Sequence, residues 1–195
     1  NRTSHWTASS RGGPCGVPRR MPRSGGHKSL PYRWRSILLT RPAIYLDADA
    51  CPVKDLIFKV AARYGVPLLV VANTPIRIPN DAVAHARMVV VPGSPDAADD
   101  WIAEHAEPGD LVLTADIPLA ARAIGKNVRA IDFRGGEYNP NRIGDALASR
   151  DLNAHLRSMG VVTGGPSAYS KNDRSKFASM LDAAVNKLSR EGASR

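Results

Sequence analysis

Short uninterrupted apolar runs recur along the chain and alternate with longer stretches of helical hydrophobic spacing. Apolar runs of this length, ending at turn residues or acids, indicate strands that are buried on both faces. Strands buried in this way are typical of parallel sheets. The predicted strands are residues 43–46, 67–72, 88–91, 111–113 and 128–131.

The intervening segments carry apolar residues three or four positions apart, which predicts amphipathic helices. Pro52 suits the first turn of one such helix, and Gly65 suits its end. Ser170 and Asp173 resemble a capping box at the start of the last helix. The predicted helices are residues 52–64, 96–106, 117–124, 141–149 and 151–159, with the last one after Ser170. Helices alternating with strands predict an α/β fold, a three-layer α/β/α sandwich with a mainly parallel sheet of about five strands.

The net charge of +9 belongs to one end of the chain. Residues 1–41 contain nine Lys or Arg and no acids, whereas the remainder has 18 basic and 18 acidic residues. We expect residues 1–41 to be a disordered basic leader, because they are rich in Arg, Gly, Pro and Ser. It is either a misplaced translation start, a fusion remnant or a transit peptide. Residues 42–190 then form a single domain, and residues 191–195 a tail.

Cysteine is sparse, and no apolar stretch approaches the length of a membrane span. Cys15 and Cys51 provide neither a disulfide framework nor a zinc site, so a reducing cytoplasm is expected. The acids beside Cys51 disfavour a reactive thiolate, and we expect it to be a small buried residue. No membrane partner is expected.

Acidic residues follow the predicted strands. Asp47 and Asp49 come after the first strand, and Asp116 after the fourth; Asp96 and Asp99 open the helix after the third. Because ligands bind beyond the carboxyl ends of parallel strands, these side chains are expected to converge. Clustered carboxylates repel one another unless a cation is present, and oxygen ligands suit Mg²⁺ or Mn²⁺. The predicted metal ligands are Asp47, Asp49, Asp96, Asp99 and Asp116.

Some residues of this cluster also have a plainer interpretation. Asp49 and Asp96 fit the positions of helix caps or turn residues. Thr114 fits three roles: orienting Asp116, contacting a phosphate, or capping the next helix. Asn73, at the end of the second strand, is a candidate for substrate binding.

Two glycine-rich loops, residues 134–136 and 163–166, could offer backbone N–H groups to a phosphate. Gly164 and Gly165 are the candidates in the second loop, although most such loops are only turns. Arginines near these loops could pair with phosphates or with the acids, or form ordinary surface ion pairs. The candidates are Arg134, Arg150 and Arg174, whereas a surface ion pair is favoured for Arg142.

Several long motifs occur in order: DADACP at 47–52, DAAD at 96–99, GDLVLTADIPLAA at 109–121, RGGEY at 134–138 and TGGP at 163–166. On these motifs the chain resembles the YaiI/YqxD family of uncharacterised bacterial proteins, over about residues 43–188. That family is regarded as PIN-like, and PIN domains are metal-dependent nucleases that typically act on RNA. The resemblance implies Asp47, Asp99 and Asp116 as the catalytic metal ligands, with Asp49 and Asp96 in support. PIN nucleases usually have Glu on the intervening helix, where this chain has Asp99.

The sequence leaves three functions open. The first is a nuclease or phosphodiesterase that depends on Mg²⁺ or Mn²⁺ and acts on RNA or a phosphorylated small molecule. The second is a phosphatase of the haloacid-dehalogenase type, with Asp47 as nucleophile and Asp49 as acid. The third is a non-catalytic module that binds nucleic acid or protein.

Overall fold

A computed structural model describes residues 34, 38, 41–91, 93–94, 96–160 and 167–193 of the chain. Its centre is a sheet of five strands in the order β3-β2-β1-β4-β5, with every neighbouring pair parallel. The strands are β1 (Ile44–Asp47), β2 (Leu68–Ala72), β3 (Ala86–Val90), β4 (Leu111–Leu113) and β5 (Arg129–Ile131). The predicted parallel sheet is confirmed.

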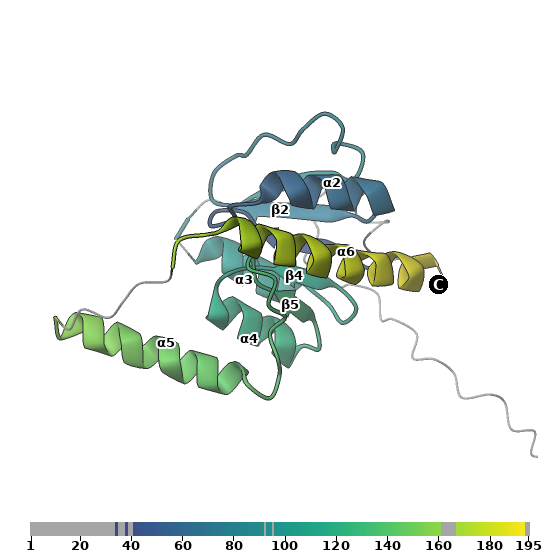
Figure 1. Cartoon of the computed structure of the whole chain (residues 1–195). Helices are drawn as coiled ribbons and strands as arrows, with labels where there is room; N and C mark the ends of the chain where they lie inside the picture. Colours follow the sequence, from purple (N-terminus) through teal and green to yellow (C-terminus); the bar gives the residue numbers. More distant parts are fainter. Residues whose placement is uncertain are drawn as a thin grey trace, which may run out of the picture.

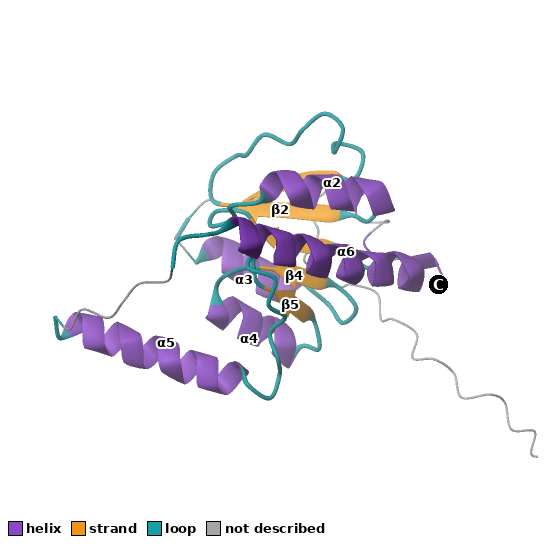
Figure 2. Ribbon diagram, viewed as in Figure 1, coloured by secondary structure: helices purple, strands orange, loops and turns teal. Residues whose placement is uncertain are grey.

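Helices cover both faces of the sheet (Figure 2). Successive residues of a strand point to opposite faces. In β1, Ile44 and Leu46 therefore join one hydrophobic core, and Tyr45 joins the other. The first core also contains residues of α2 (Lys54–Tyr64) and α6 (Lys171–Ala193), and the second those of α3 (Ala97–His105) and α4 (Ile117–Gly125). This arrangement is the predicted three-layer α/β/α sandwich.

One prediction about helices is wrong. Residues 141–149 and 151–159 were expected to form two helices, but α5 (Ile143–Ser158) is a single one of 16 residues. Nothing at Arg150 or Asp151 interrupts the backbone, because neither residue breaks a helix. No residue of α5 is buried, and the helix lies at the margin of the molecule beside α4 (Figure 1).

The start of α6 is held by the predicted capping box, which the structure confirms. The backbone N–H of Asp173 donates to Ser170 Oγ at 3.1 Å, and the Ser170 N–H donates to Asp173 Oδ2 at 2.9 Å.

The loop after β5 packs closely on α6. A Cβ on Gly135, whose φ is +84°, would lie 2.7 Å from the backbone of Lys176. Glycine is therefore needed at this position for both conformation and space.

Trp34 and Leu38, both in the predicted leader, pack against the second core, and Leu38 is fully buried there. Most of residues 1–41 lie outside the described residues, so a disordered leader stays a prediction. Within the described ranges, no helix combines the length and apolarity required to cross a membrane.

Candidate functional site

The site lies where β1 and β4 run side by side at the centre of the sheet. After β1 the chain continues into α2 on one face, and after β4 it continues into α4 on the other. Connections that diverge in this way open a crevice at the carboxyl ends of the two strands. Asp47 is the last residue of β1, and Thr114 follows β4 directly.

Thr114 joins the two central acids. Its hydroxyl donates a 2.9 Å hydrogen bond to Asp47 Oδ2 and accepts one of 2.9 Å from the Asp116 backbone N–H. Asp116 Oδ2 in turn accepts from the Leu119 N–H at 2.9 Å and so caps α4. Thr114 therefore orients both acids, and the capping role belongs to Asp116.

Asp49 links the next pair of strands. Its Oδ2 accepts a 3.0 Å hydrogen bond from the backbone N–H of Asn73, which follows β2. The N-cap position of α2 is Val53, so Asp49 does not cap that helix. The ends of β1 and β2 are thus held together at the same edge of the sheet as the central acids.

Asp99 extends toward this edge from α3. Its pKa is raised to about 7, first by burial and then by the negative charges of Asp47, Asp116 and Asp96. Burial also raises the pKa of Asp47, although the hydrogen bond from Thr114 acts in the opposite direction. The charges of Asp47, Asp96 and Asp116 therefore reach Asp99, and both Asp47 and Asp99 are harder to ionise than an exposed carboxyl.

The two acids beside Asp99 differ from it. Asp96 occupies the N-cap position of α3, yet its side chain makes no capping hydrogen bond. Asp100 points away to Arg122, with 2.7 Å between Oδ1 and Nη1. Asp100 therefore provides a matched control for experiments on Asp99.

The carboxylates are grouped, but they are not arranged as a ligand set. In the described ranges, no three His, Cys, Asp or Glu side chains lie close enough together to hold a metal ion. The chemistry of the donors suits a hard cation, because all are oxygens. The metal-ligand assignment of Asp47, Asp49, Asp96, Asp99 and Asp116 stays a prediction.

The predicted arginines separate into two groups. Arg134 pairs with Asp173 at 3.0 Å, and Arg174 pairs with Asp55 at 2.6 Å. Both ion pairs involve α6 rather than the acidic edge. Arg150 approaches the acidic edge: its Nη2 lies 3.9 Å from Asp116 Oδ1. This contact agrees with one of the roles expected for Arg150, pairing with the acids.

The loop after β5 is organised by Asp132. Its Oδ1 accepts from the backbone N–H groups of Arg134 at 2.7 Å and Gly136 at 2.9 Å. These N–H groups therefore already have a partner within the loop. Gly164 and Gly165, the candidates in the second glycine-rich loop, lie outside the described residues.

Cys51 lies next to the acids and is buried, as predicted. Burial raises the pKa of its thiol to about 11. The thiol is therefore protonated at neutral pH, which argues against a nucleophilic role.

The family model described as "Uncharacterized BCR, YaiI/YqxD family" matches residues 45–187. The chain belongs to this family. A UPF0178 protein of Caulobacter sp. (strain K31) is 52% identical over 147 residues, which are 75% of this chain and 96% of the relative. A UPF0178 protein of Brucella ovis is 52% identical over 149 residues, which are 76% of this chain and 92% of the relative. No solved structure matches.

Proposed function

We propose that this protein is a divalent-metal-dependent phosphodiesterase whose substrate is RNA or another phosphodiester. One observation carries the proposal: acids from β1, α3 and the β4–α4 connection lie close enough that burial and their mutual repulsion together raise the pKa of Asp99 to about 7. Mutual repulsion of this kind destabilises a fold unless a ligand relieves it. A divalent cation at the acidic edge provides that relief.

Each residue has a distinct part in this proposal. Asp47, Asp99 and Asp116 would hold Mg²⁺ or Mn²⁺, with Asp49 and Asp96 in support. A cation bound there would supply charge neutralisation at the phosphodiester and activation of water. Thr114 keeps Asp47 and Asp116 in position through its two hydrogen bonds. Arg150, beside Asp116, binds a phosphate oxygen. We place the activity in the cytoplasm, in keeping with the sparse cysteine.

The test combines metal binding with catalysis. We expect calorimetry to detect Mn²⁺ binding to the wild type, and hydrolysis of single-stranded RNA or bis(p-nitrophenyl) phosphate in its presence. Asp47→Asn and Asp99→Asn should each lower kcat/KM at least about 100-fold, because each removes a charged ligand. Asp100→Asn is the matched control and should stay within about twofold.

Two results would overturn the proposal. One is equal Mn²⁺ uptake by the wild type and by the double variant Asp47→Asn with Asp116→Asn. The other is an absence of hydrolysis with either metal while a control nuclease is active. A trapped aspartyl-phosphate on Asp47 would instead support the haloacid-dehalogenase-type phosphatase.

A further inference from the structure

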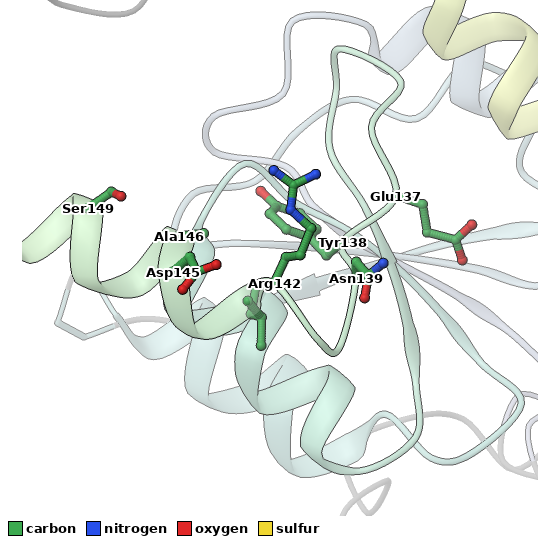
Figure 3. Close-up of a pocket in the computed structure, with 8 residues that line it drawn as sticks. Glu137, Tyr138, Asn139, Arg142, Asp145, Ala146 and Ser149 are labelled. Carbon is green, nitrogen blue, oxygen red and sulfur yellow. The ribbon is translucent and has the colours of Figure 1, made fainter.

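A cavity of about 350 Å³ lies between the chain after β5 and the first turns of α5 (Figure 3). Its size is within the range of small-molecule sites. Residues from both segments line it, and in Figure 3 the side chain of Glu137 points away from it. Glu137 is instead held by Arg129 at 2.7 Å.

The floor of this cavity is apolar and firmly supported. Tyr138 and Ile143 both line it, and both pack against the second hydrophobic core. The backbone of Tyr138 is fixed as well, because its N–H donates to the Ala130 carbonyl of β5 at 3.0 Å. A half-buried aromatic ring held in this way is a suitable platform for stacking a nucleic-acid base.

Polar side chains also line the cavity, those of Asn139, Arg142 and Asp145. Asn139 Oδ1 accepts a 2.8 Å hydrogen bond from the Asn141 N–H, which orients its side chain. An amide, a guanidinium and a carboxylate supply both donors and acceptors for the edge of a base.

The cavity is adjacent to the acidic edge. Ser149 of α5 lines the cavity, and the next residue, Arg150, lies 3.9 Å from Asp116. The pKa of Tyr138 is raised by burial and then by the charges of Asp132 and Asp116, so its hydroxyl lies within their field. One ligand could therefore occupy the cavity and place a phosphate at Arg150.

We propose that this cavity binds the base of a nucleoside phosphate, stacked on Tyr138, with the phosphate held by Arg150 at the acidic edge. The inference rests on the proposed function and names its substrate class. The ligand is a nucleoside 5′-phosphate unit, and both a free nucleotide and a single strand of RNA contain this unit.

Calorimetry with the full chain in EDTA tests the inference without catalysis. The probes are UMP, AMP, uridine and a five-nucleotide single-stranded RNA. We expect Tyr138→Leu to weaken nucleotide binding about 5- to 150-fold, and Tyr138→Phe, which keeps the ring, to have little effect. Asn139→Ala, at a less buried position, is a second variant in case Tyr138→Leu unfolds. It should weaken the binding of UMP and of AMP by different factors. If the RNA binds more tightly than UMP, the natural ligand is a strand. If the two affinities are equal, it is a free nucleotide.

The phosphate position has its own control. In the wild type, the phosphate should make UMP bind more tightly than uridine. Arg150→Ala should weaken UMP binding by that same factor and should leave the affinity for uridine unchanged. Arg157→Ala, further along the same helix, should change neither. The inference is overturned if no nucleotide or RNA binds, or if Tyr138→Leu and Asn139→Ala both bind as the wild type does. Nucleotide binding without metal-dependent hydrolysis would overturn only the proposed function, and hydrolysis without nucleotide binding would overturn only this inference.

Discussion

Thr114 Oγ1 lies 2.9 Å from Asp47 Oδ2, and this hydrogen bond joins the ends of two neighbouring parallel strands. Thr114 is fully buried, and Asp47 is only 6% exposed. The same hydroxyl accepts from the Asp116 N–H, so one side chain sets the positions of two acids. The relative position of these two acids therefore depends on Thr114.

Replacing Thr114 by Val keeps the shape of the side chain and removes both hydrogen bonds. We expect a loss of about 1–3 kcal/mol in the free energy of unfolding, because a buried carboxylate loses its donor. The pKa of Asp47 should rise further, since the lost bond favours its charged form. Urea titration measures the stability, and Thr114→Ser, which keeps the hydroxyl, should lose less. Equal losses in the two variants would contradict this account.

Asp99 should make stability depend on pH. Its pKa is about 7 in the folded protein, against an ordinary 3.8. Between about pH 4 and 7 the folded state therefore binds more protons than the unfolded state, and stability falls as pH rises. Above pH 7 the destabilisation is complete.

Asp99→Asn removes this titration. We expect it to stabilise the metal-free protein at pH 8 by on the order of 1–3 kcal/mol, since solvent screens part of the effect. At pH 4 the gain should vanish. Thermal unfolding at the two pH values measures the difference, and Asp100→Asn should show no such dependence. A gain that is the same at both pH values would exclude this origin.

Gly135 should tolerate no side chain. Gly135→Ala places a methyl group 2.7 Å from the backbone of α6 at a φ of +84°, so we expect a loss of more than about 2 kcal/mol. At Gly144, in α5, a Cβ meets nothing within 4 Å. Gly144→Ala should therefore stabilise the protein by about 0.5–1 kcal/mol. Denaturant midpoints of the two variants should move in opposite directions.

Arg150 and Arg174 should differ in their effect on catalysis. Arg150→Ala removes a cation beside Asp116, and we expect kcat/KM for a phosphodiester to fall at least about tenfold. Arg174→Ala breaks an exposed ion pair with Asp55, so the free energy of unfolding should change little. Its kcat/KM should stay within about twofold. A large catalytic loss in Arg174→Ala would support the substrate-binding role predicted for that residue.

The hydrophobic pattern of the sequence predicted most of the architecture. The errors in the predicted strand and helix boundaries have local causes. β3 begins at Ala86, two residues before the predicted strand, because the exposed Arg87 interrupts the apolar run of an edge strand. The two helices predicted around Arg150 are one, because polar residues do not end a helix unless they offer the backbone another partner. The acids after the strands could be singled out from the sequence because ligands of parallel α/β sheets bind beyond that end of the strands.

The sequence by itself determined the strands, the alternating helices and the placement of acids at strand ends. These features depend on periodicity and composition over a few neighbouring residues. Tertiary structure alone decided which groups meet: Thr114 and Asp47 are 67 positions apart, and they meet because β1 lies between β2 and β4 in the sheet. It also brought Arg150 to Asp116, paired Arg134 with Asp173 of α6, and paired Arg174 of α6 with Asp55 of α2. Such contacts arise from strand order and helix packing, which local hydrophobic patterns do not encode.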